Sequence, residues 1–209
     1  MRLFSLKRRP KVFFIGFNKC GTKTFHHFFA ANGYRSAHYA CKAHAFAAPL
    51  PMARVMADNI AASRPVLTGL THYDAFSDMT FADMHRVIEA NLFFRQFHAE
   101  CPDAYFVFND RPVEKWLLSR AKHGNAHNGS FIARHASALM LSQEATIDHW
   151  RQQYVRHKQD VLAYFSGHER FMVFDLEADG PEQMAAFLKP HYRFENSKWT
   201  HRGATKNGQ

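Results

Sequence analysis

The stretch KVFFIGFNKCGTKTFHHFFAANG, from Lys11 to Gly33, constrains the fold more than any other part of the chain. It begins with an apolar run typical of a buried strand, continues through a turn rich in glycine and lysine, and ends in an amphipathic helix. Glycines let a backbone wrap closely around a ligand, and the amides at the start of a helix attract anions. The pattern therefore predicts a phosphate-like anion held between a strand and a helix.

Strands and helices alternate along the rest of the chain. We expect strands at residues 11–16, 34–39, 65–70, 104–109 and 170–174, and helices at residues 24–31, 52–63, 83–100, 112–122, 131–141, 149–165 and 181–188. Such alternation is typical of a parallel sheet with helices on both faces. The expected fold is therefore an α/β three-layer αβα sandwich with a central, mainly parallel sheet, formed as a single domain by residues 1–209.

Ligands of such folds bind beyond the carboxyl ends of the strands. The loops after Gly16, Asn109 and Phe174 emerge at that edge if their strands are parallel. The segment between the second strand and His72, and residues 124–142, are expected to shape the pocket of a second substrate.

The net charge of +9 and the pI near 9.6 favour an anionic partner. Cys20, Cys41 and Cys101 are too far apart for a zinc knuckle or a disulfide framework, so we expect no metal and a reducing compartment, the cytoplasm. No apolar run approaches the roughly 18–20 residues that a membrane span requires. The apolar stretch at residues 12–17 is also too short for the core of a signal peptide.

The glycine and lysine turn matches the nucleotide-binding P-loop, GxxxxGK[ST], only in part. Gly16 and Gly21 have the required spacing, but Thr22 separates the second glycine from Lys23. The other lysine, Lys19, forms a Lys-x-Gly-Thr pattern instead.

The stretch FNKCGTKTF resembles the first loop of the sulfotransferases that use 3′-phosphoadenosine 5′-phosphosulfate (PAPS). Their second signature is a central strand, then an arginine, and a serine eight residues later; AYFVFNDRPVEKWLLSRAKH supplies Arg111 and Ser119. YDAFSD at residues 73–78 is similar to a stretch of small family members. The resemblance implies a P-loop NTPase-like sulfotransferase fold and an enzyme that moves a sulfuryl group from PAPS to a hydroxyl or amine, without a metal.

The resemblance also implies roles for single residues. Lys19 is expected to stabilise the bridging oxygen and the leaving phosphate. The 5′-phosphosulfate is expected to bind at Lys19, Cys20, Gly21, Thr22, Lys23 and Thr24, and the 3′-phosphate at Arg111 and Ser119. Arg111 and Ser119 lie about two helical turns apart, so both can face one phosphate. Arg202, in the basic tail, is expected either to close over that phosphate or to lie in a solvated terminus.

An acceptor hydroxyl needs a general base, and three residues are candidates: His72, Asp74 and Asp78. The sequence does not choose among them. It also leaves open the oligomeric state and the acceptor, for which we expect a small molecule or a glycan and not a nucleic acid.

Two other functions remain open on the sequence alone. A nucleotide-dependent kinase or NTPase needs an aspartate that holds a metal after a strand, and Asp110 and Asp175 have that position. A non-enzymatic module that binds polyanions agrees with the net charge, although the basic residues are dispersed and no nucleic-acid recognition motif is evident.

Overall fold

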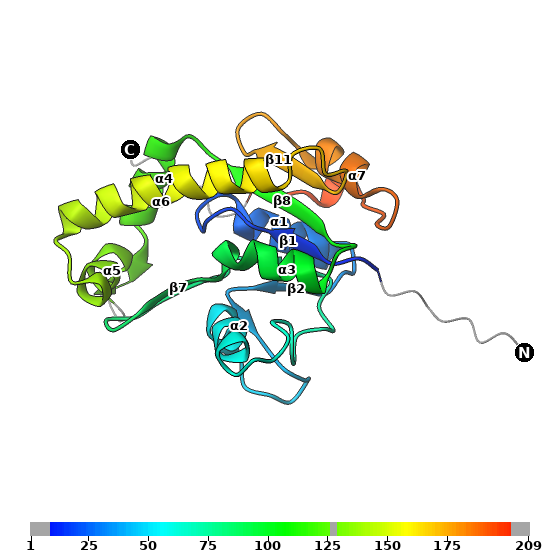
Figure 1. The fold of residues 1–209 in the computed structure, drawn as a ribbon. Helices are drawn as coiled ribbons and strands as arrows, with labels where there is room; N and C mark the ends of the chain where they lie inside the picture. Colours follow the sequence, from blue (N-terminus) through cyan, green and yellow to red (C-terminus); the bar gives the residue numbers. More distant parts are fainter. Residues whose placement is uncertain (1–8, 126–128, 202–209) are drawn as a thin grey trace, which may run out of the picture.

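A sheet of seven strands, in the order β11-β8-β1-β5-β2-β3-β4, forms the middle layer of the computed structural model, which describes residues 9–125 and 129–201 (Figure 1). Its parallel strands are β1 (Val12–Phe14), β2 (Ser36–His38), β5 (Ala75–Ser77), β8 (Tyr105–Asp110) and β11 (Phe171–Asp175). At one edge, the short strand β3 (Ala40–Cys41) pairs antiparallel with β2, and β4 (Leu50–Pro51) pairs antiparallel with β3. The prediction of a mainly parallel sheet is confirmed.

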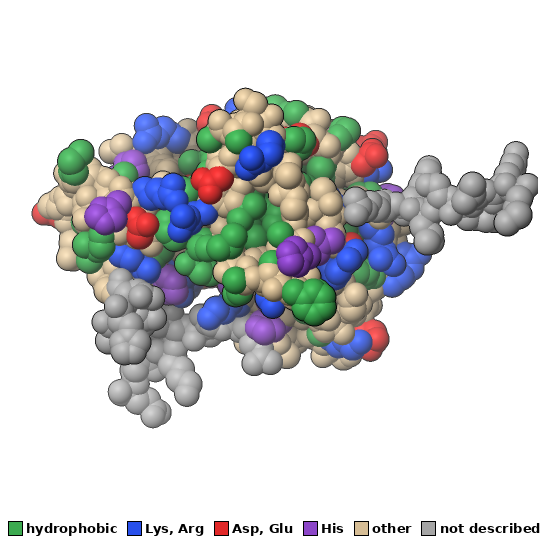
Figure 2. Space-filling model, turned by 90° about the horizontal axis from the view of Figure 1, so that it is seen from below, with side chains coloured by type: hydrophobic (Ala, Val, Ile, Leu, Met, Phe, Trp, Pro, Cys, Tyr) green, Lys and Arg blue, Asp and Glu red, His purple; other side chains and the backbone are tan. Residues whose placement is uncertain are grey.

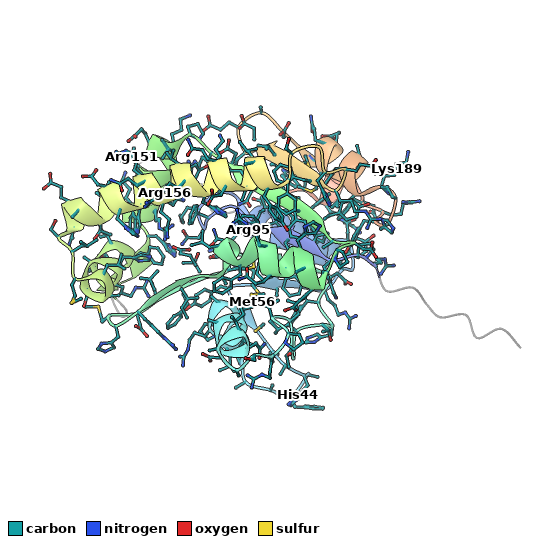
Figure 3. The ribbon with its side chains drawn as sticks, viewed as in Figure 1. His44, Met56, Arg95, Arg151, Arg156 and Lys189 are labelled. Carbon is teal, nitrogen blue, oxygen red and sulfur yellow. The ribbon has the colours of Figure 1, made fainter. Side chains whose placement is uncertain are left out.

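Helices cover both faces of the sheet because side chains along each buried strand alternate between two apolar cores. Val12 and Phe14 of β1 join the core under α1 (Thr22–Ala31) and α7 (Pro181–Leu188). Phe13 joins the opposite core, against α2 (Met52–Ala61), α3 (Phe94–Glu100) and α6 (Gln143–Tyr164). Figure 3 shows Met56 of α2 beneath α3, inside this second core. The three-layer αβα prediction is therefore confirmed.

A third apolar cluster lies beyond the sheet and is built on α4 (Val113–Ala121), α5 (Phe131–Leu139) and the first half of α6 (Figure 1). The antiparallel pair β6 (Thr80–Ala82) and β7 (Val87–Glu89) contacts α5. Arg120 of α4 is fully buried in this cluster, where it forms an ion pair with Glu89. The remaining elements are β9 (Gly124–Asn125), β10 (Gly129–Ser130), η1 (Ala90–Phe93) and η2 (Asn196–Lys198).

The strand predicted at residues 65–70 is wrong. This segment forms consecutive turns, in which Thr68 donates to the carbonyl of Pro65 and Leu70 to that of Leu67. Gly69 has a φ of +80°, which belongs to the left-handed region and not to a strand. The parallel strand at this place in the chain is β5, which begins at Ala75.

The helix predicted over residues 83–100 is only partly correct. Asp83 accepts hydrogen bonds from the backbone amides of His85 and Arg86, and this turn directs the chain into β7. Helical structure begins with η1, and the α-helix itself is confined to α3. At α6 the error is the opposite: the helix begins at Gln143 and not at residue 149, because the Ser142 hydroxyl caps it at the amide of Ala145.

No helix within residues 9–125 and 129–201 is both long and apolar enough to cross a membrane. Even α6, with 22 residues, is largely polar.

Gly16 lies where β1 ends, and a Cβ atom there would be 2.3 Å from the backbone oxygen of Asn109. We expect Gly16→Ala to lower the free energy of unfolding by more than about 2 kcal/mol, since the clashing atom belongs to the central strand β8. At Gly180 a Cβ atom would meet only the ends of two flexible side chains, the Glu182 carboxylate at 3.1 Å and the Gln183 amide oxygen at 3.6 Å. Gly180→Ala is the control and should stay within about 1 kcal/mol of wild type in urea unfolding. Equal losses for the two variants would contradict the close approach at Gly16.

Candidate active site

The loop between β1 and α1 lies at the carboxyl edge of the sheet, where β8 and β11 also end. Leu176, the residue after β11, faces Gly21 so closely that a Cβ atom on this glycine would be 2.4 Å from a leucine methyl group. The predicted convergence of the loops after Gly16, Asn109 and Phe174 is thereby confirmed.

Asn109 holds both ends of this loop through one side-chain amide. Its Oδ1 accepts a hydrogen bond of 2.8 Å from the amide of Gly16, and its Nδ2 donates one of 2.8 Å to the carbonyl of Cys20. Asn109 is fully buried, so both bonds are shielded from water. The shape of the loop therefore depends on a residue of the neighbouring strand.

Two side chains after β8 bind the middle of the loop. Arg111 donates from Nη1 to the carbonyl of Lys19 at 3.1 Å, and Trp116 donates from its indole nitrogen to the carbonyl of Asn18 at 2.9 Å. These bonds turn the carbonyls of Asn18 and Lys19 toward the protein. The neighbouring amides therefore point to the other side of the backbone. The loop is thus arranged as a set of donors.

The backbone of the loop has the conformation expected for an anion site. Lys19 and Gly21 have φ values of 67° and 73°, and such left-handed residues turn successive amides toward one point. α1 begins directly after Gly21 with no acidic residue in its first turn and no side-chain cap. The positive end of the α1 dipole, which attracts a negative ligand, is therefore not neutralised by an acidic side chain in the first turn.

Burial raises the pKa of the Cys20 thiol to about 12, so this side chain is a neutral, fully buried thiol. Cys20 can serve an anion only through its backbone. Burial, reinforced by Lys23, lowers the pKa of Lys19 below its ordinary value. An ammonium group in this environment gains from a bound anion.

The second predicted signature consists of Arg111 and Ser119, which lie beside the loop and on α4. Arg111 lies against the loop, and its Nε is buried without a hydrogen-bond partner among the described residues. Ser119 is a buried residue of α4, the helix that Arg111 precedes. Arg202 lies outside the described residues.

Of the three candidate bases, the structure brings only Asp78 to the loop. Asp78 follows β5 at the carboxyl edge, whereas His72 and Asp74 precede β5 at the opposite edge. There the Asp74 carbonyl accepts from the amide of Val12, the first residue of β1, and the Asp74 carboxylate accepts from the amide of Arg35. A parallel sheet separates these two edges by the full length of its strands.

Asp78 contacts His38, the last residue of β2, which sequence reasoning missed. The His38 Nε2 lies 3.4 Å from the Asp78 carboxylate and 3.3 Å from the hydroxyl of Thr22. Burial, followed by the effect of Glu89, raises the pKa of Asp78 to about 7. Burial and the neighbouring His26 lower the pKa of His38 to about 3. The pair therefore combines a carboxyl group that titrates near neutral pH with a neutral imidazole.

Backbone strain is concentrated at the same place. Five non-glycine residues in the described part of the chain have a positive φ, and three of them, Lys19, Tyr39 and Asp78, belong to this site. Strained backbone of this kind is often found where side chains must be held in fixed positions for function.

A cavity of about 420 Å³ opens beside Asp78. It is lined by Lys23, His38, Tyr39, Asp78, Thr80, Ala82, His123, Gly124, Phe131 and Arg134. Part of segment 124–142, which was expected to shape a second pocket, forms one wall of this cavity. The volume is sufficient for a small ligand.

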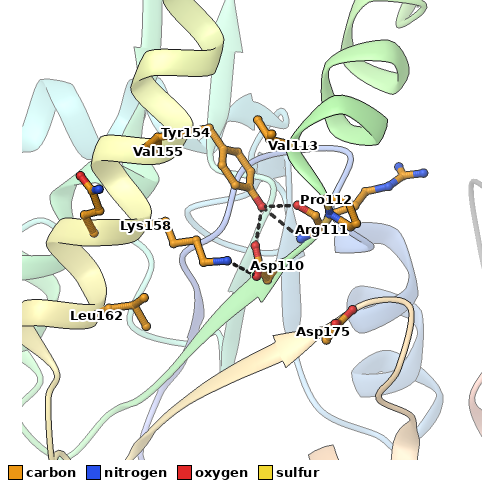
Figure 4. A pocket seen from close by; sticks show the side chains of 10 residues that line it. Asp110, Arg111, Pro112, Val113, Tyr154, Val155, Lys158, Leu162 and Asp175 are labelled. Carbon is orange, nitrogen blue, oxygen red and sulfur yellow. Dashed lines mark hydrogen bonds and ion pairs between the residues drawn. The ribbon is translucent and has the colours of Figure 1, made fainter.

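A second cavity, of about 490 Å³, lies between the end of β8 and α6 (Figure 4). Two aspartates line it, Asp110 and Asp175. Asp110 accepts a hydrogen bond from the Tyr154 hydroxyl at 2.7 Å and pairs with Lys158 at 2.5 Å. Figure 4 shows the Arg111 side chain pointing away from these groups. Both oxygens of Asp110 are thus engaged by protein groups, which does not favour Asp110 as the metal-holding aspartate of a kinase.

Asp175, the other aspartate considered for a metal, accepts a hydrogen bond from the amide of Glu177. Within the described ranges, no group of three histidine, cysteine, aspartate or glutamate side chains is arranged to hold a metal ion.

Sequence reasoning missed several residues of the site, among them His38, Asn109, His123 and Arg134. His38 and Asn109 stand at the ends of two strands that the sequence does predict, so the rule for carboxyl edges could have found them. His123 lies on a loop and Arg134 on a helix. No local sequence pattern predicts where this loop and this helix lie relative to the sheet.

The shifted pKa of Asp78 makes stability depend on pH. Between the ordinary value of 3.8 and about 7, the unfolded chain ionises Asp78 while the folded protein keeps the proton, so this residue lowers stability as the pH rises. Relative to wild type, Asp78→Asn should gain at least about 1 kcal/mol of unfolding free energy between pH 4 and pH 7. Urea unfolding at several pH values measures this gain.

Asp83→Asn is the control, because backbone hydrogen bonds lower the pKa of Asp83 and keep it ionised across this window. Parallel pH curves for wild type and Asp78→Asn would contradict the elevated pKa.

A model of the sulfotransferase domain family matches residues 11–192 of the chain. This range includes the loop, Arg111, Ser119, Asp78 and both cavities. No curated protein matches the sequence. Since the family model covers most of the chain and agrees with the αβα fold and its carboxyl-edge site, the protein belongs to the sulfotransferase domain family.

Proposed function

We propose that the protein is a PAPS-dependent sulfotransferase that modifies a hydroxyl or amine of a small molecule or glycan. The observation that carries this proposal is the loop between β1 and α1. Trp116 and Arg111 bind its carbonyls at Asn18 and Lys19, Lys19 and Gly21 have left-handed φ values, and α1 begins directly after Gly21 without a side-chain cap. Sulfuryl transfer needs such a cluster of donors because negative charge accumulates on the leaving phosphate.

The residues of the site fit the donor PAPS. The loop amides from Cys20 to Thr24, the Lys19 ammonium and the Thr22 hydroxyl match a 5′-phosphosulfate. The buried, unpartnered Nε of Arg111 matches a further phosphate, for which Ser119 would be a second donor. When bound, PAPS supplies an activated sulfuryl group.

In this proposal Lys19 stabilises the charge that develops on the leaving phosphate, and Asp78 accepts the proton of the acceptor. A base works best when its pKa lies near the working pH, and the pKa of Asp78 is about 7. Neutral His38 orients the Asp78 carboxylate from 3.4 Å. His72 and Asp74 have no part in proton transfer, because they lie at the far edge of the sheet.

A kinase or a polyanion-binding module has less support. The kinase needs a metal-holding aspartate, and Asp110 already pairs with Lys158. A polyanion module needs a continuous basic surface, but on the face that Figure 2 draws, lysine and arginine side chains form separate groups, interrupted by hydrophobic and histidine side chains.

We expect adenosine 3′,5′-bisphosphate (PAP) to raise the melting temperature without any metal. A ligand at 100 times its dissociation constant adds about 2.7 kcal/mol of stability, which thermal melting detects readily. ATP with magnesium should have a much smaller effect. Stabilisation by ATP with magnesium alone would favour the kinase, and no response to either ligand would favour the polyanion module.

The same assay tests Arg111 when AMP, which lacks the 3′-phosphate, is compared with PAP. Arg111→Ala should weaken the binding of PAP about tenfold to a hundredfold, since a charged hydrogen bond contributes roughly 1.5–3 kcal/mol. The affinity for AMP should stay nearly unchanged. An equal loss for both ligands would mean that Arg111 only supports the loop.

Lys19→Ala should lower kcat by about 30- to 1,000-fold while PAP still binds, as expected for a group that acts mainly in the transition state. The rate is measured as PAP formation with the best acceptor from a screen of hydroxyl compounds. Lys189→Ala is the control, because Lys189 lies at the end of α7, away from the loop (Figure 3). Transfer at the wild-type rate by Lys19→Ala would overturn the role given to Lys19.

A further inference from the structure

The cavity beside Asp78 carries more positive than negative charge. Lys23 lines it from α1 and Arg134 from α5, and Asp78 is the only acidic residue among the described lining residues. The two histidines that line it, His38 and His123, have pKa values lowered to about 3 and about 4, so both are neutral near pH 7.

Arg134 has no carboxylate partner within the described part of the chain, unlike Arg120, Arg151 and Arg170. Its guanidinium lies 5.3 Å from the centre of the Phe131 ring, and its Nε is buried with no hydrogen-bond partner among the described residues. An arginine held on an aromatic ring, with an unused donor beside a cavity, is arranged to bind an oxyanion such as a carboxylate or a sulfate.

The surroundings of His123 show that several cations act on the same space. Burial is the main cause of its low pKa, and Lys19, Arg134 and Lys23 follow in that order. These cations belong to the loop, α5 and α1, so positive potential reaches the cavity from separate elements. A cavity with low-dielectric walls concentrates such potential and attracts anions.

The negative charge of PAPS does not account for Arg134. The groups proposed to hold the donor are on the loop, at the start of α1 and around Arg111, and Arg111 lines the other cavity. Arg134 lines the cavity of Asp78, where the acceptor hydroxyl must lie to lose its proton in the proposed reaction.

We propose that the acceptor is an anion, an alcohol or amine that carries a carboxylate or sulfate group bound by Arg134 with the help of Lys23. This inference rests on the proposed sulfotransferase function and narrows its acceptor class. Asp78 faces the hydroxyl, and the anionic group of the acceptor lies toward α5. A positively charged acceptor is disfavoured by the same cations.

The test uses acetate and sulfate as minimal anionic probes of the cavity. They are titrated into PAP-saturated protein at constant ionic strength, and NMR follows the ring signals of His38 and His123, which line the cavity. Wild type should show a saturable shift. Arg134→Gln should weaken the response about tenfold or more, and Arg134→Lys should restore part of it.

Arg156→Gln is the matched control, because it removes the same charge from an exposed position on α6 (Figure 3). It should leave the response unchanged. The inference is overturned if wild type shows no saturable shift, or if Arg134→Gln responds as strongly as wild type.

Two pairs of acceptors, each with an anionic and a neutral member, then test which anionic group on the acceptor the protein prefers. Methyl glucuronide is compared with methyl glucoside, and 4-hydroxybenzoate with 4-hydroxybenzyl alcohol, in kcat/KM at saturating PAPS. The anionic member of at least one pair should be preferred, and Arg134→Gln should remove that preference. A preference for both neutral compounds would overturn the inference.

Failure of this inference is distinct from failure of the proposed function. The PAP-induced rise in melting temperature is recorded on the same samples. Its loss contradicts the donor, whereas its presence without a response that depends on Arg134 contradicts only the anionic acceptor.

Discussion

The site depends on one buried side-chain amide, that of Asn109. Its two ends bind Gly16 and Cys20, so the loop that follows β1 takes its shape from β8. Gly16 must be glycine for this, because a Cβ atom would overlap the Asn109 backbone oxygen. The proposed anion site therefore depends on two neighbouring parallel strands and not on the glycine and lysine loop alone.

Charges at the site are arranged differently from those elsewhere in the protein. Burial alone raises the pKa of Glu89, but Arg120, with His135 and Thr80, outweighs burial and lowers this pKa to about 2. The charges of Arg120 and Glu89 therefore compensate each other within the fold. Lys23 and Arg134 have no carboxylate partner among the described residues, and uncompensated cations of this kind point to an anionic ligand.

The sequence could predict the features that depend on local patterns. The apolar run before Gly16 and the apolar run before Asp110 predict two central strands, and both are confirmed as β1 and β8. The weak strand at residues 65–70 was wrong because turns around Gly69 outweighed its apolar residues. The strand that does form, β5, begins after Asp74, so His72 and Asp74 lie at the edge of the sheet opposite to the loop. His123 and Arg134 could not be predicted, because only tertiary packing brings α5 to the cavity.

The buried pair of Arg120 and Glu89 explains how the cavity and the loop keep a fixed relation. Arg120 lies on α4, the same helix from which Trp116 binds the loop, and Glu89 ends β7, which pairs with β6. Thr80 of β6 lines the cavity and donates to the Glu89 carboxylate at 2.7 Å. Four aromatic rings surround the Arg120 guanidinium, at 4.7–5.5 Å, and leave it little room to move. One buried arginine thus connects the helix that shapes the loop after β1 to a wall of the cavity beside Asp78, and the proposed in-line transfer requires that these two parts keep a fixed distance and orientation.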